Sequence, residues 1–157
     1  GQDVIVDLAA QAARPLDKWM TETGLIDLGD EIGLDVTLWH VMDDGSDSVR
    51  LLGEVLSAHG SDPSYVLVRN FGRGTDFSML EESDEQAKAA EYGAQTMDLP
   101  ALHSGTMRKI DRTGASYWAA ANNKDASVGP TLGLLERQRV KIWLSKAYSE
   151  LDRVLAT

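Results

Sequence analysis

Apolar and polar positions recur along this chain with two different periods, and the alternation predicts the order of its elements. Short apolar runs are typical of strands, and four are present: Val4 to Leu8, Asp35 to Met42, Ser64 to Phe71, and Thr96 to Leu102, which contains Pro100. Amphipathic stretches typical of helices follow the first three runs: from about Pro15, Ser48 to Ala58, and Met79 to Ala94.

Strands that alternate with helices indicate parallel pairing, because parallel neighbours need a connection of about helix length. The pattern therefore predicts an α/β fold with a mostly parallel sheet flanked by helices. Residues 103–123 also have a helical pattern, and residues 131–156 predict a long C-terminal helix. Its apolar face comprises Leu135, Val140, Trp143, Leu144, Ala147, Leu151 and Leu155.

Composition agrees with one globular domain over residues 1–157, since 43% of the residues are hydrophobic and 25% are charged. The formal charge of −10 opposes binding of the whole domain to nucleic acid or anionic lipid. The absence of cysteine excludes disulfides and thiolate metal sites, and it fits a cytoplasmic setting. The start at Gly1 suggests a processed or truncated chain.

The first apolar run is followed by two candidate phosphate-site residues. In "DVIVDLAAQ", an acid and then a glutamine come after a strand-like segment. In phosphate-loop proteins such an acid, here Asp7, organises Mg²⁺. Gln11 lies four residues further on, the spacing of the Ras-type glutamine that orients the attacking water, although Ala10 replaces the usual glycine. The alternative is that Asp7 caps the next helix and Gln11 is a solvated loop residue.

The order of four short motifs resembles the C-terminal two-thirds of a ParA/MinD-type deviant-Walker ATPase. These motifs are "DVIVDLAAQ", "LDVTLWHVMDDGSDSVRLLGEVL", "YVLVRNFGRG" and "MDLPAL". The tail "ID…SYWAAA…LLERQRVKIWL" is similar to the TraL-like or StbB-like branch of plasmid mobilisation and conjugal transfer. The resemblance implies an ATP- and Mg²⁺-dependent homodimer that switches its binding to plasmid-transfer or partition proteins.

The resemblance also implies roles for individual residues. Asp7 matches the Walker B acid that organises Mg²⁺, and Asn70 matches the asparagine that contacts adenine. Pro100, Ala101 and Leu102 match the segment that lines the base pocket. An amide offers both a donor and an acceptor, which suits the edge of adenine. The alternative for Asn70 is a turn-forming role ahead of Gly72 and Gly74.

The chain also departs from the family pattern. The signature lysines, the phosphate-binding glycines and the switch segment with its usual catalytic Asp all lie before the Walker B strand in the family, and this sequence has no counterpart. Neither "GRGTDFS" nor "GPTLG" has the spacing that directs a lysine to the phosphates. We therefore expect that the chain is the C-terminal part of a longer ATPase, or a homologue that has lost the activity, and that alone it does not hydrolyse ATP.

Other features point more weakly to function. His40, His59 and His103 are scattered without metal-ligand spacing. "MDDG", residues 42–45, resembles the acidic pocket of receiver domains, but helix capping by Ser46 or Asp47 is the favoured interpretation. The C-terminal helix carries an excess of basic residues that could touch a membrane or DNA, although packing of its apolar face against the core explains it more simply.

Three hypotheses follow: a ParA/MinD-like ATPase or fragment, a catalytically inactive interaction module, and an unrelated receiver-like or ligand-binding domain. A sheet that lacks strands exposes an edge and an apolar face. We therefore expect the isolated chain to self-associate.

Overall fold

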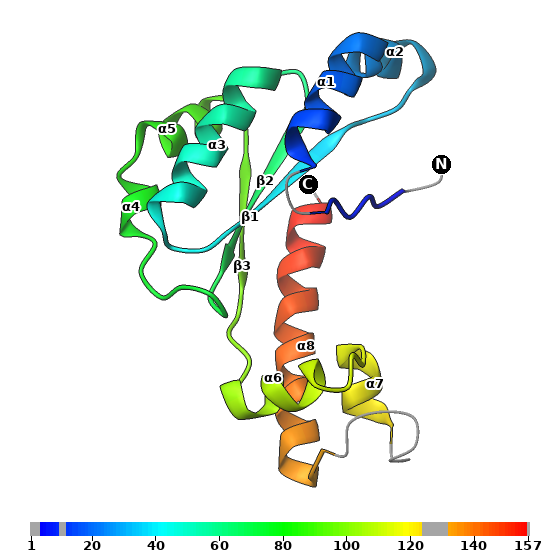
Figure 1. Cartoon of the computed structure of the whole chain (residues 1–157), viewed down its shortest axis with the longest axis vertical. Helices are drawn as coiled ribbons and strands as arrows, with labels where there is room; N and C mark the ends of the chain where they lie inside the picture. Colours follow the sequence, from blue (N-terminus) through cyan, green and yellow to red (C-terminus); the bar gives the residue numbers. More distant parts are fainter. Residues whose placement is uncertain (1–3, 10–11, 124–131, 157) are drawn as a thin grey trace.

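The computed structural model describes residues 4–9, 12–123 and 132–156, and within them the chain forms an α/β fold (Figure 1). Three parallel strands form one sheet in the order β1-β2-β3: β1 (Thr37–Met42), β2 (Ser64–Asn70) and β3 (Gln95–Leu99). The prediction of parallel strands flanked by helices is confirmed: β1 and β2 lie within the runs that predicted them, and β3 begins one residue before its run.

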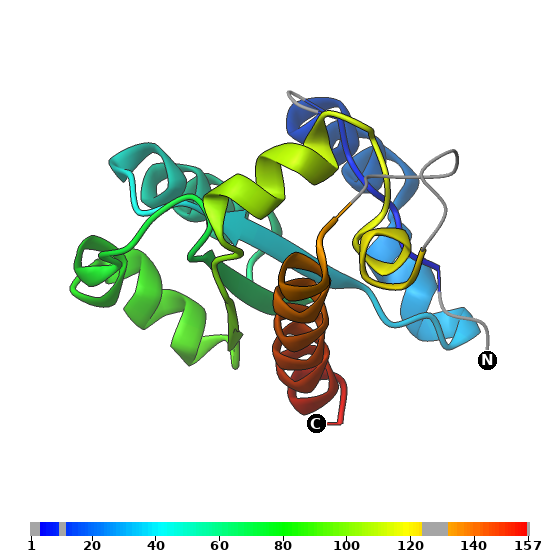
Figure 2. The ribbon, with the colours of Figure 1, turned by 90° about the horizontal axis from the view of Figure 1, so that it is seen from below.

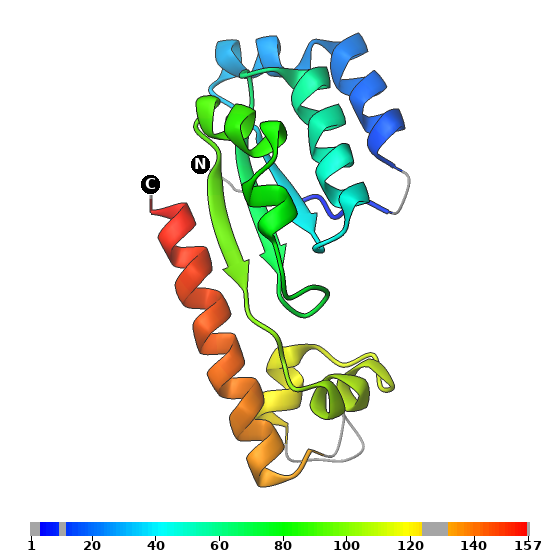
Figure 3. The ribbon, with the colours of Figure 1, turned by 90° about the vertical axis from the view of Figure 1, so that its left-hand side faces the viewer.

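Helices cover both faces of the sheet, and two further helices pack against the first half of the long C-terminal helix (Figure 3). The elements are α1 (Ala13–Thr23), α2 (Leu25–Ile32), α3 (Ser46–His59), α4 (Ser78–Glu81), α5 (Asp84–Glu91), α6 (Ser104–Asp111), α7 (Tyr117–Asn122) and α8 (Leu134–Leu155). In Figure 3, α3, α4 and α5 lie on one side of the strands and α8 on the other, while α6 and α7 pack around the first half of α8. Figure 2 shows the same arrangement from below, almost along α8.

The alternation of side chains along β2 explains the two layers. Tyr65 and Leu67 are buried with Leu52 and Leu56 of α3, whereas Val66 and Val68 are buried with Val154 of α8. Successive residues of a strand point to opposite faces. Because both faces of β2 are covered, its sequence is a continuous apolar run from Tyr65 to Val68.

The long C-terminal helix mostly has the predicted apolar face. Val140 and Ala147 are buried, and Trp143 and Leu144 pack against a cluster that also contains residues of α6 and α7. Packing against the core is therefore confirmed for the middle of this face. The two terminal members differ, since Leu135 is 74% exposed and Leu155 is 67% exposed.

Two predicted elements are wrong. Val4 to Leu8 is not a strand: the run pairs with no strand of the sheet, and Ile5 is 96% exposed. Apolar strands need a neighbour to satisfy their backbone, and the described residues supply none for this run. The helix predicted over Met79 to Ala94 is divided at Ser83, whose extended backbone ends the first piece and whose hydroxyl accepts a hydrogen bond from the Gln86 N–H at 3.1 Å.

Candidate functional site

The carboxyl ends of the strands bring two predicted segments together. Asn70 is the last residue of β2 and pairs in register with Leu99, the last residue of β3. The Phe71 N–H donates to the Leu99 carbonyl at 2.9 Å, which continues the pairing for one more residue. Pro100 therefore begins beside Asn70, at the edge of the sheet where open α/β proteins bind ligands.

Asn70 makes the turn that the alternative interpretation expected. Its Oδ1 accepts a hydrogen bond from the Gly72 N–H at 3.0 Å, which closes a turn over two residues. Its Nδ2 forms no hydrogen bond with any residue that the structure describes, and the side chain is only partly buried. Both N–H donors of the amide are thus free for a ligand, while the oxygen already accepts one hydrogen bond.

The three residues after β3 have different surroundings. The Pro100 carbonyl accepts a hydrogen bond from the Trp143 indole N–H at 2.6 Å, which fixes the segment against α8. Leu102 is 8% exposed and belongs to the cluster beneath α6 and α7, whereas Ala101 is exposed. Pro100 and Ala101 can therefore line a ligand pocket, but the structure directs Leu102 into the core.

Asp7, the predicted Mg²⁺ residue, does not join this edge. Asp7 is exposed on a segment that is outside the sheet, and Gln11 lies outside the described residues. Within 4–9, 12–123 and 132–156, no group of three or more His, Asp or Glu residues could hold a metal ion. The described part of the chain thus contains no site that fits Mg²⁺.

Asp44, the second acid of the "MDDG" stretch, ties together the loops after β1 and β2. The Asp44 carboxylate accepts hydrogen bonds from the Thr75 N–H at 2.8 Å and the Asp76 N–H at 3.3 Å. Gly74 allows this approach, because a Cβ at that position would lie 2.5 Å from the Asp44 Cγ. Gly74, the second glycine of "GRGTDFS", therefore has a packing role. Only its contact with Asp44, 30 positions earlier in the chain, reveals that role.

Asp43 organises the start of α3. Its Oδ1 accepts from the Ser48 hydroxyl at 2.6 Å and from the Gly45 N–H at 3.0 Å, and the first of these bonds lowers the pKa of Asp43 most. The favoured capping interpretation is wrong for this helix: Gly45 occupies the capping position, and Ser46 and Asp47 lie within the first turn.

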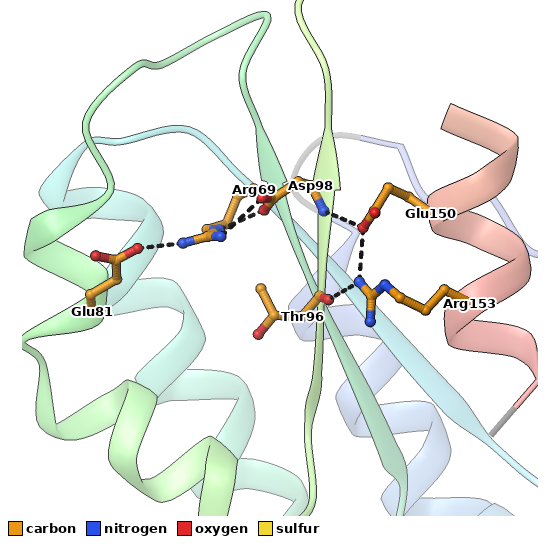
Figure 4. Close-up of polar contacts among 6 residues, drawn as sticks. All are labelled: Arg69, Glu81, Thr96, Asp98, Glu150 and Arg153. Carbon is orange, nitrogen blue, oxygen red and sulfur yellow. Dashed lines mark hydrogen bonds and ion pairs between the residues drawn. The ribbon is translucent and has the colours of Figure 1, made fainter. Parts of the chain in front are cut away.

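A polar network crosses β2 and β3 and reaches α8 (Figure 4). Arg69 donates to both carboxylate oxygens of Asp98, at 2.7 and 3.0 Å, and also pairs with Glu81 of α4. These contacts, led by the bond to Asp98, raise the pKa of Arg69. Asp98 pairs with Arg69 in register, so the bond is a cross-strand pair on the face toward α5.

Two residues of α8 bind the outer edge of β3. The Asp98 N–H donates to Glu150 Oε2 at 3.4 Å, and Arg153 donates to the Thr96 carbonyl at 2.6 Å and to Glu150 at 2.8 Å. A shallow hollow of about 270 Å³ adjoins them, lined by Asp98, Pro100, Lys146, Ser149 and Glu150. Sequence patterns cannot find these contacts, because they join residues more than 50 positions apart.

The three histidines do not form a metal site. His59 is buried and bonds to Asp17 Oδ1 at 2.8 Å, which holds α1 against α3. His40 lies 3.2 Å from the Ser48 carbonyl, and burial lowers its pKa. His59 and His40 thus have separate surroundings.

Comparisons of the chain with protein-family models, with curated proteins and with solved structures find no match. Among the described helices, none has the length and the apolar composition needed to cross a bilayer. The functional argument therefore rests on the geometry of the sheet and its edges.

Proposed function

We propose that this chain supplies the adenine-binding side of a ParA/MinD-like ATPase that acts in plasmid conjugation, mobilisation or stability. In this proposal a preceding segment contributes the phosphate loop, and ATP with Mg²⁺ drives homodimerisation that switches binding to plasmid-transfer or partition proteins. The support is the order of the motifs together with one structural observation, the adjacency of Asn70 and Pro100.

That adjacency carries the proposal because it joins two segments that lie 30 positions apart in the sequence. The pairing of Asn70 with Leu99 supports the proposal, because it brings the backbone of Asn70 beside the residue that precedes Pro100, and the Asn70 Nδ2 has no hydrogen bond to any described residue. A flat purine needs such an arrangement: a surface to lie on, and an amide to bond to its edge.

The described residues offer no comparable binding site for the phosphates or for Mg²⁺. The described residues include neither a phosphate loop nor a cluster of metal-ligating side chains. Asp7 and Gln11 remain proposed contributors that would act only together with the phosphate loop of the preceding segment. Hydrolysis is accordingly assigned to the larger protein, and this chain contributes binding and orientation of the base.

A catalytically inactive interaction module is the second candidate, and a specific observation favours it. Trp39 is 38% exposed and Val41 is 61% exposed on β1, a strand that has a neighbour on one side only among the described residues. Exposed apolar side chains on an edge strand are typical of a surface that another protein covers.

Adenosine titration followed by ¹H–¹⁵N NMR tests the proposal on the chain itself. We expect the largest shifts at the Asn70 side-chain amide and at the Phe71 and Ala101 backbone amides. Asn70→Asp is the informative variant, because it keeps the oxygen that accepts from Gly72 but replaces the free donor with an acceptor.

Asn122→Ala serves as the control, since the Asn122 amide bonds to the Trp118 carbonyl on α7. Asn70→Asp should abolish the shifts, and Asn122→Ala should preserve them. If adenosine causes no shifts in the unmodified chain, or the same shifts in Asn70→Asp, the adenine assignment is wrong.

A further inference from the structure

The outer edge of β1 presents unpaired backbone groups. The Val36 carbonyl accepts from the Ser64 N–H at 3.0 Å, on the side toward β2. Alternate residues of a strand direct their backbone groups to the same side. Thr37, Trp39 and Val41 therefore direct theirs away from β2, where no described residue bonds to them.

The side chains at the same positions form an uncovered apolar strip. Trp39 and Val41 pair in register with Val66 and Val68, so they share the face of the sheet that α8 covers. α8 extends over β2 and β3 only, and it leaves the two β1 residues exposed. The edge carries no lysine, proline or bulge of the kind that protects natural edge strands.

Acidic residues flank this edge at both ends. Asp35 precedes β1 and Asp43 follows it, and both are exposed. Arg73 interacts with Asp43 electrostatically and offsets part of its charge. A strand that arrives with basic residues at its ends would pair with these carboxylates.

The same charges disfavour a second copy of the chain as the occupant. Antiparallel self-pairing centred on Trp39 would place Asp35 opposite the Asp43 of the other copy. Parallel self-pairing in register would place each acid opposite its own counterpart. The net charge of −10 adds to this repulsion.

We propose that the outer edge of β1 binds an extended apolar segment with basic residues at its ends, which adds a fourth strand to the sheet. This mode is β-strand addition, in which backbone hydrogen bonds provide affinity and alternate side chains provide specificity. It requires no nucleotide, so its failure and the failure of the adenine assignment are separate results.

Amide hydrogen exchange with a synthetic probe, Lys-Thr-Val-Thr-Val-Thr-Val-Thr-Lys, tests the proposal, because its valines and both lysines share one face and the lysines have the spacing of Asp35 and Asp43. We expect the probe to slow exchange of the Thr37, Trp39 and Val41 N–H groups. The same peptide with glutamate in place of both lysines should give much less protection. Asp35→Lys changes an exposed charge outside the strand, and it should weaken the lysine-ended probe about threefold to fivefold.

Val41→Pro removes one outward donor while leaving the bonds to β2 in place, and Val41→Ala is its matched control. The proline variant should lose the protection and the alanine variant should keep it. Three results would overturn the proposal: no protection by the lysine-ended probe, equal protection by both probes, or concentration-dependent protection of the same amides without any probe, which would identify a second copy as the occupant.

Discussion

The two edge strands of the sheet, β3 and β1, differ in whether side chains bond to their outward backbone groups. At β3, Glu150 and Arg153 of α8 bind the Asp98 N–H and the Thr96 carbonyl, and so replace part of the bonding that a further strand would provide. At β1, no described residue bonds to the outward backbone groups, and Trp39 and Val41 are exposed beside them. Among the described residues, side chains of α8 thus take the place of a further strand at β3, whereas the outer edge of β1 is unpaired.

The difference extends from the edges to the face that they share. α8 buries Val66, Val68 and Met97 with its own Val154, but it does not reach β1. Burial of apolar area contributes about 25 cal/mol per Å², so the covered part of the face stabilises the fold and the β1 part does not. Added contacts at Trp39 and Val41 of β1 therefore have stabilisation left to contribute.

The largest expected effect comes from the same substitution on the two parts of this face. Val68 is 4% exposed, and its register partner Val41 is 61% exposed. Val68→Ala should lower the free energy of unfolding by roughly 2 kcal/mol through lost burial and the cavity it leaves. Val41→Ala should lower it by about 0.5 kcal/mol or less. Urea unfolding measures both, and equal losses would show that β1 is already covered in the isolated chain.

Much of this fold follows from local patterns. The apolar patterns that predicted the three paired strands and α8 correspond to elements of the structure. The parallel order follows from the helices between the strands. Ser83 was missed because a single serine inside an otherwise helical pattern is a weak signal, although its capping position before Gln86 explains the break once the backbone is known.

The failure at Val4 to Leu8 has a different cause. A strand is stable only with a neighbour, and a single run of sequence does not say whether that neighbour exists. The adjacency of Asn70 and Pro100 could be expected, since carboxyl ends of parallel strands meet at one edge. The burial of Leu102 and the bonding of Glu150 and Arg153 could not, because each depends on where α8 packs.

A smaller, pH-dependent change in the free energy of unfolding is expected at the β3 edge, where Glu150 bonds to the strand. The bond from Arg153 lowers the pKa of Glu150 most, with a further contribution from the Asp98 N–H. A lowered carboxylate pKa stabilises the fold at pH values above the ordinary pKa of 4.5, and this contribution is lost as the pH falls through the lowered value.

Glu150→Gln should remove that dependence and lower stability at neutral pH by about 1 kcal/mol or less. Glu91→Gln, on an exposed residue of α5, is the matched control. Urea unfolding at several pH values between 3 and 7 checks both. A Glu150→Gln profile parallel to that of the unmodified chain would show that the β3 edge is not held by this carboxylate.

The smallest effect is expected where the predicted first strand has no partner. Ile5 is 96% exposed and Val4 is 81% exposed, so Ile5→Ser removes almost no buried area. Its free energy of unfolding should stay within about 0.5 kcal/mol of that of the unmodified chain. If the variant instead loses about 1.5 kcal/mol or more, Val4 to Leu8 packs against the molecule in solution. Such a loss, together with slow amide exchange at Thr37 and Trp39 before any probe is added, would mean that the chain covers its own β1 edge.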